Sequence, residues 1–110
     1  MIHIIADNAT PEQVRDMLET LGTYIKLAVD VQQRLVAGGG EMHADCEAVL
    51  LEAGSQQRDV WGADWFPSSN TVRCQSLINL RPKQENRSLE IADPVLRKTI
   101  EDIVHERFGS

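Results

Sequence analysis

The sequence has 110 residues, of which 42% are hydrophobic and 25% are charged, and its formal net charge is −6. These proportions are those of an ordinary globular protein, and they exclude a disordered chain or a fibrous repeat. The negative charge argues against nucleic-acid binding, because affinity for phosphate backbones comes from clustered Lys and Arg. The length predicts a single domain over residues 1–110.

The sequence predicts a cytoplasmic protein that does not enter the membrane. No apolar run reaches the roughly 20 residues of a membrane span, and residues 1–7 lack the basic start of a signal peptide. Cys46 and Cys74 match no CxxC metal motif. In the cytoplasm we expect them to be reduced thiols rather than a disulfide.

A short strand and a helix are the first expected elements. Residues 2–5 are β-branched or His and predict the strand. Thr10 can cap a helix, and Pro11 suits its first position because the missing N–H is not needed there. Apolar residues then recur at helical spacing until Gly22, which suits a left-handed residue after the last turn. We therefore expect a helix over residues 11–21.

Residues 24–37 fit two patterns. Apolar and polar residues alternate from Tyr24 to Val31, and several of the apolar ones are β-branched, which predicts strand, turn and return strand. The same segment contains a helical stripe and many good helix formers, so a helix continuing to Ala37 is the alternative. We favour the two strands, with their turn near Gln32 and Gln33.

From Glu41 onward the hydrophobic period is two, which predicts a three-stranded antiparallel meander over about residues 42–80. Turn residues at 53–55 and 67–70 separate its strands. With two-residue loops at both turns, one face becomes almost wholly apolar and the other largely polar. The expected core face holds Ala44, Cys46, Ala48, Leu50, Trp61, Ala63, Trp65, Val72, Cys74, Ser76, Ile78 and Leu80. The apolar residues interspersed on the polar face are Val49, Leu51, Val60 and Leu77.

The C-terminal part is expected to add a short edge strand and a second helix. Residues 87–91 predict the strand. Asp93 can cap a helix that begins with Pro94, and an apolar stripe continues from there to Phe108.

The predicted fold is therefore of the α+β class and has two layers. An antiparallel sheet, with the three-stranded meander at about 42–80 in its centre, is covered on one face by two helices at about 11–21 and 94–108.

His43, Asp45 and Glu47 are the first candidate site. On a strand these alternate residues project to one side, with roughly 6.5–7 Å between successive members. A nitrogen and several carboxylates suit a divalent metal such as Zn²⁺ or Mn²⁺, or general acid and base catalysis. The spacing matches no defined metal motif, however, and on a straight strand the three lie too far apart to share one ion. The alternative is a solvated sheet face with cross-strand ion pairs, in which Asp64 lies opposite His43 and Arg73.

Arg81, Asn86 and Arg87, with Ser88, are the second candidate site. They lie in a polar connection, and such donors can bind a carboxylate or phosphate. The alternative is that the arginines tie this connection to neighbouring acidic residues.

Several segments together resemble a family of small prokaryotic proteins classed as a domain of unknown function. They are GGEMHADCE at 39–47, Gly54-Ser55, DVWG at 59–62, INLRP at 78–82 and NRSLEI at 86–91. The likeness covers most of the chain after Tyr24. It implies a free-standing bacterial or archaeal protein, and it brings with it no catalytic residue.

Two functions compete at this point. The first is a binding or interaction module that uses the polar sheet face or an exposed sheet edge to meet a protein partner or a second copy. The second is a small metal-assisted hydrolase with His43, Asp45 and Glu47 at its centre, in which Arg73 or Arg81 steadies an anionic substrate.

Overall fold

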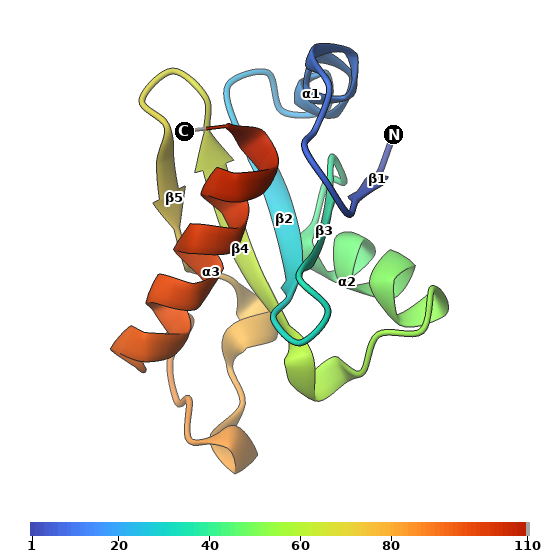
Figure 1. Cartoon of the computed structure of the whole chain (residues 1–110). Coiled ribbons are helices and arrows are strands. Elements are labelled where there is room, and N and C mark those ends of the chain that lie inside the picture. The colour runs from blue at the N-terminus through green and yellow to red at the C-terminus, as the bar shows by residue number, and fades with distance from the viewer. Residues whose placement is uncertain (110) are drawn as a thin grey trace.

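A computed structural model describes residues 1–109. Its centre is a five-stranded, wholly antiparallel sheet in the order β1-β3-β2-β4-β5 (Figure 1). The strands are β1 (His3–Ile5), β2 (Ile25–Asp30), β3 (Leu35–Gly38), β4 (Val60–Phe66) and β5 (Thr71–Arg73). The short strands β1 and β5 are therefore the two edges.

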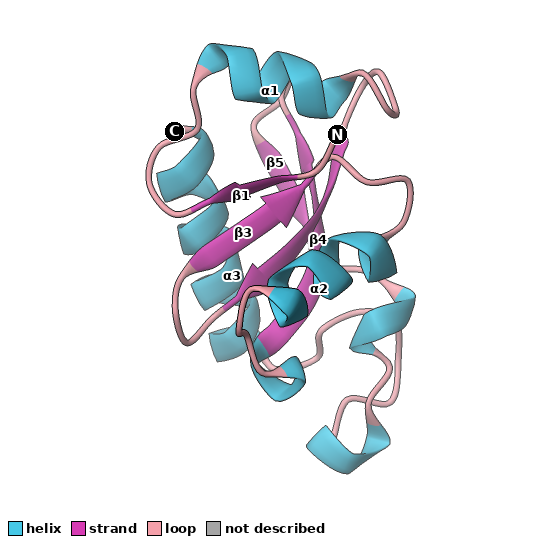
Figure 2. Ribbon diagram, turned by 90° about the vertical axis from the view of Figure 1, so that its right-hand side faces the viewer, coloured by secondary structure: helices cyan, strands magenta, loops and turns pink. Residues whose placement is uncertain are grey.

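Two helices cover one face of the sheet. Helix α1 (Pro11–Leu18) crosses one end of the sheet, and α3 (Pro94–Phe108) runs along its face (Figure 2). Alternate residues of β2 and β4 point into this layer, because side chains of a strand alternate between faces. The buried cluster includes Met17, Ile25, Leu27, Val29, Trp61, Trp65, Ile100, Ile103 and Val104. The α+β class and the position of both predicted helices are confirmed, although α1 ends three residues earlier than expected.

Helix α2 (His43–Glu52) packs against the opposite face of the sheet (Figure 1). There Cys46 and Leu50 join Ala28, Ala37 and Val60 in a second, smaller buried cluster. The sheet therefore has helices on both faces, so it is not the two-layer arrangement that the sequence predicts.

The strand predicted from Glu41 to Leu50 is wrong, and α2 stands in its place. Ala44 and Ala48, expected in the core, are exposed, whereas Cys46 and Leu50 are both buried. Residues four apart share a face of a helix, so the period-two pattern satisfied a helical face equally well. Composition favoured the helix, because Val49 is the only β-branched residue of α2.

The strand–turn–strand interpretation of residues 24–37 is confirmed by β2 and β3. Asp30, wholly buried at the end of β2, accepts hydrogen bonds from the backbone N–H groups of Gln32 and Gln33 at 2.9 and 3.0 Å. The Asp30 carboxylate thus provides hydrogen-bond acceptors for the backbone N–H groups of the turn between the two strands.

The hairpin of β4 and β5 is also confirmed, with Asp64 opposite Arg73 as predicted. The third predicted strand, however, ends at Arg73 instead of Leu80. Ser76 accepts a hydrogen bond from the N–H of Ile78 at 3.3 Å and begins a 3-10 helix, Leu77–Asn79 (η2). Leu80, expected in the core, is 45% exposed.

Residues 74–91 form a long loop, called here the 74–91 loop, which is held by buried amides rather than by a strand. Asn79 is wholly buried, and its side chain binds both the N–H and the C=O of Gly62, at 2.8 and 3.0 Å. Asn86 donates to the carbonyl oxygens of Asn79 and Glu90 at 2.7 and 2.9 Å. The edge strand predicted at 87–91 is reduced to a single bridge between Gln75 and Glu90, because these amides take up its backbone groups.

No helix within residues 1–109 is long and apolar enough to cross a membrane.

Candidate functional site

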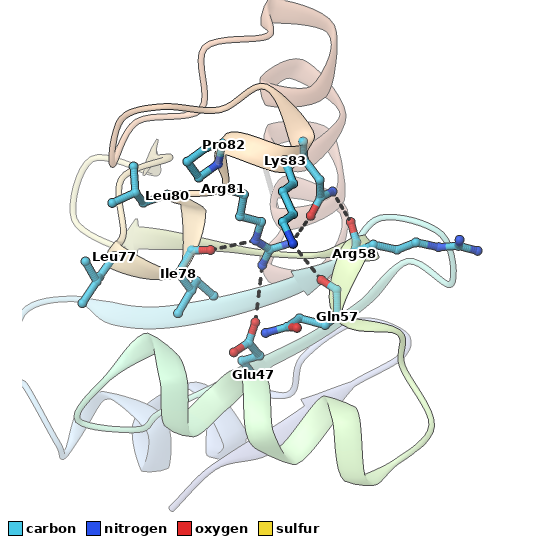
Figure 3. Close-up of a pocket in the computed structure, with 10 residues that line it drawn as sticks. Glu47, Gln57, Arg58, Leu77, Ile78, Leu80, Arg81, Pro82 and Lys83 are labelled. Carbon is cyan, nitrogen blue, oxygen red and sulfur yellow. Dashed lines mark hydrogen bonds and ion pairs between the residues drawn. The ribbon is translucent and has the colours of Figure 1, made fainter.

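A pocket of about 690 Å³ lies between α2, the 3-10 helix Gln57–Asp59 (η1) and the 74–91 loop. We call it the Arg81 pocket (Figure 3). Its apolar wall consists of Leu77, Ile78, Leu80 and Pro82. Its polar lining consists of Glu47, Gln57, Arg58, Arg81, Lys83 and Gln84. The pocket thus joins an apolar wall to a charged one.

Glu47 and Arg81 point toward each other in this pocket (Figure 3). Nη2 of Arg81 lies 3.4 Å from Oε2 of Glu47, and the two side chains are 11% and 12% exposed. Removal from water raises the pKa of the Glu47 carboxyl, and the positive charge of Arg81 offsets only part of this rise. The same burial lowers the pKa of Arg81. The pocket therefore holds a carboxyl that takes up a proton more readily than one in water.

Every N–H donor of Arg81 is used within the protein. Its acceptors are the carbonyl oxygens of Gln57, Val60 and Ile78 and the side chains of Glu47 and Gln84. The guanidinium also lies over the Trp61 ring, 4.4 Å from its centroid. Arg81 thus joins the 74–91 loop to η1 and β4, and it offers no free donor to a ligand.

Arg58 and Lys83 supply the accessible positive charge of the pocket. Both are exposed, and neither forms an ion pair with any of residues 1–109. On the apolar wall of the same pocket Leu77 is 71% exposed and Leu80 45%. Large apolar side chains exposed in one pocket with unpaired cations are typical of a binding surface rather than of a core.

The structure does not bring the predicted anion-binding residues together as one set of donors. Arg81 lies in the pocket with its donors engaged, and the Asn86 amide is buried with its nitrogen on backbone carbonyls. Arg87 is exposed and does not line the pocket. The anion role of these three residues stays a prediction.

His43, Asp45 and Glu47 all lie in the first half of α2. Residues two apart on a helix point about 200° apart, so Asp45 projects away from the other two, and it is exposed. Glu47 faces the Arg81 pocket. Within residues 1–109, no three His, Cys, Asp or Glu side chains are grouped so as to hold a metal ion. Metal binding by these residues stays a prediction.

His43 instead forms a pair with Asp64, as the expected register had placed it, although it reaches Asp64 from a helix. Its Nε2 lies 2.7 Å from Oδ1 of Asp64, and Arg73 donates to the other oxygen at 2.8 and 3.1 Å. The Asp64 side chain is 2% exposed, so these contacts compensate a buried charge. Part of the polar sheet face is thus covered by α2 and is not an open surface.

Comparison with known protein families assigns the chain to one family. The family model described as "Protein of unknown function (DUF5674)" matches residues 3–107. The chain belongs to this family. No curated protein and no solved structure matches the chain significantly. The resemblance to a domain of unknown function is thereby confirmed.

Sequence reasoning missed Arg58, Leu77 and Lys83 as site residues of this DUF5674 protein. One signal was present, because Leu77 interrupts the polar face of the predicted meander. A large apolar residue at a polar position indicates either a wrong register or an exposed contact residue. Arg58 and Lys83 carried no such signal, since surface cations are common everywhere.

Proposed function

We propose that this DUF5674 protein is a binding module, and that its Arg81 pocket receives a ligand that joins an apolar group to a negative charge. One observation carries the proposal: Leu77 and Leu80 are exposed in the lining of the same pocket as Arg58 and Lys83, two cations without an ion-pair partner among residues 1–109. An apolar group would cover the leucines, and an anionic group would meet the cations at the rim. The internal pair of Arg81 and Glu47 would form the floor.

The polar groups of the floor suit binding more than turnover. Arg81 is held by backbone carbonyls, so its side chain has a fixed direction in the pocket. Glu47 is paired with it, which limits the repulsion that a lone carboxylate would exert on an anionic ligand. A shaped apolar surface with few polar groups is typical of ligand sites.

Octanoate, which combines an apolar chain with a carboxylate, is the probe for this proposal. We expect its titration, followed by amide NMR shifts, to perturb residues 57–58 and 77–84 before other parts of the chain. Arg58→Gln with Lys83→Gln should weaken binding about threefold, as expected for exposed charges. Arg15→Gln, which removes one exposed cation of α1 that has no ion-pair partner among residues 1–109, is the control for loss of positive charge away from the Arg81 pocket.

Octanol and butyrate separate the two parts of the ligand. If the proposal holds, each binds more weakly than octanoate, the first because it lacks the charge and the second because it lacks most of the apolar chain. Shifts spread evenly over the protein, or equal effects of the Arg15 and Arg58/Lys83 variants, would refute it.

We also propose a cytoplasmic location. Cys46 and Cys74 are both free and buried, which supports a compartment where thiols stay reduced. Fractionation of cells that express the untagged protein tests this location, and recovery in the membrane or secreted fraction would contradict it.

A further inference from the structure

We propose that the ligand of the Arg81 pocket is an acidic segment of a partner protein, and that a second apolar side chain of this segment enters a neighbouring pocket beside His43. This inference rests on the proposed function and names the partner that the same surface fits. The supporting observation is that two adjacent pockets share one surface with four exposed apolar side chains and several cations.

The neighbouring pocket, called here the His43 pocket, has a volume of about 370 Å³. It lies between the start of α2, β2, β4 and β5, and the 74–91 loop, and its lining includes Tyr24, Met42 and Leu89. Leu77 and Ile78 line both this pocket and the Arg81 pocket. The two hollows are therefore adjacent, with the exposed Leu77 between them.

Exposed apolar side chains gather at these two pockets. Among residues 1–109, seven large hydrophobic residues are exposed, and four of them line one pocket or both: Met42, Leu77, Leu80 and Leu89. The remaining three are Met1, Ile4 and Val95. Such a concentration marks a contact surface, whereas single scattered apolar residues need no explanation.

The charge of this surface is opposite to that of the whole protein. The linings of the two pockets contain five cations, Lys26, Arg58, Arg73, Arg81 and Lys83, and two carboxylates, Glu47 and Asp64. Both carboxylates are buried and face an arginine, so the accessible charge is positive although the chain carries −6. An acidic partner complements this surface and is repelled by most of the rest.

The pairing of hollows favours a polypeptide over a small molecule. A small ligand usually places most of its surface in one cavity, whereas a chain segment binds adjacent hollows with successive side chains. A symmetric pair of copies is disfavoured, because a twofold interface would bring the same basic surface of each copy together. We therefore assign the surface to a different, acidic protein.

Selection from a random dodecapeptide library tests the proposal. We expect the wild-type protein to enrich peptides that contain two large apolar residues flanked by Asp or Glu. A synthetic peptide of this kind should bind the Met42→Ser, Leu89→Ser variant about tenfold more weakly than wild type, because one apolar side chain of the peptide loses its contacts. Val95→Ser, which changes an exposed apolar residue of α3, is the control and should leave the affinity unchanged.

The outcomes separate this inference from the proposed function. The Met42/Leu89 variant could bind the peptide like wild type while Arg58→Gln with Lys83→Gln weakens binding. This result would refute a contact in the His43 pocket and would support binding in the Arg81 pocket. If no acidic apolar peptide is enriched but octanoate binds as expected, the partner is not a polypeptide segment. A dimer in light scattering that the peptide dissociates would assign the surface to a second copy and overturn the inference.

Discussion

Arg81 holds the base of the 74–91 loop against the rest of the protein. Its guanidinium donates to the carbonyl oxygens of Ile78 and Gln57, both at 2.8 Å, and stacks on Trp61. Such charge-assisted bonds in a partly buried site are stronger than neutral ones and fix the direction of the side chain. The loop is thereby kept at the distance from α2 that opens the Arg81 pocket.

Glu47 makes the stability of the protein depend on pH in an unusual direction. Because burial raises the pKa of this carboxyl in the folded state, the folded protein takes up the proton at higher pH than the unfolded chain does. Wild type should therefore gain stability relative to Glu47→Gln as the pH falls from the raised folded pKa to the ordinary pKa of an unfolded Glu. Above the raised pKa the difference should be constant. Urea denaturation of both proteins at several pH values measures it.

Glu52→Gln is the matched control for this measurement, because it removes one carboxylate from an exposed position of the same helix. A wild type that loses stability relative to Glu47→Gln on acidification would show that the attraction of Arg81 outweighs the cost of burial.

β4 packs directly against η2 because residue 62 has no side chain. A Cβ on Gly62 would lie 2.5 Å from Cβ and 2.7 Å from Oγ of Ser76. The Asn79 amide binds the backbone of Gly62 at the same place. The 74–91 loop is thus fitted to the sheet at a point where any larger residue collides.

Gly62→Ala should lower the free energy of unfolding by about 1–3 kcal/mol, the usual cost of overpacking. Ser76→Gly removes the atoms that clash, so the double variant should be less destabilised than the sum of the two single ones. Chemical denaturation of all four proteins gives this coupling energy. Additive effects would contradict a direct collision between the two residues.

The two buried clusters lie on opposite faces of the same strands. Ile25, Leu27 and Val29 of β2 enter the cluster below α3, while Ala28 between them enters the cluster below α2. Because both clusters pack on the same strands, unfolding of the sheet exposes both clusters to water. The whole protein should therefore unfold in one transition.

Leu50→Ala tests this coupling. Leu50 belongs to α2 and is wholly buried in the smaller cluster, whereas both tryptophans lie in the other cluster. We expect a loss of about 2–5 kcal/mol, with tryptophan fluorescence and far-UV circular dichroism changing together. Leu77→Ala, at an exposed position, should change stability by less than about 0.5 kcal/mol. Melting of helix signal before the fluorescence change would show that α2 unfolds independently.

Local signals in the sequence predicted much of the fold. Asp93 and Pro94 begin α3 as expected, with the Asp93 carboxylate accepting from the N–H of Val95 at 2.9 Å. Thr10 caps α1 as expected, and Gln13 completes a capping box with it. Alternation placed Trp61 and Trp65 correctly in the core, because both belong to a strand with one face under helices. Each of these features depends on neighbours along the chain.

The candidate site was less predictable, because its residues come from separate elements. Glu47 was singled out as a metal ligand on a strand, yet it faces Arg81 from a helix. Arg81 was chosen for its donors, which the carbonyl oxygens of three other segments take up. No spacing within the sequence reveals such contacts.

By itself the sequence determined the capped helices α1 and α3 and the β4–β5 hairpin, and it favoured the β2–β3 turn over a helix, because caps, turns and alternation act over a few residues. Only the tertiary structure decided that residues 43–52 are a helix and that residues 74–91 are a loop held by Asn79, Asn86 and Arg81. In the first case one hydrophobic pattern satisfies both a strand and a helix, and packing on the second face of the sheet selects the helix. In the second, buried side-chain amides and a guanidinium satisfy backbone groups that a strand would otherwise have paired.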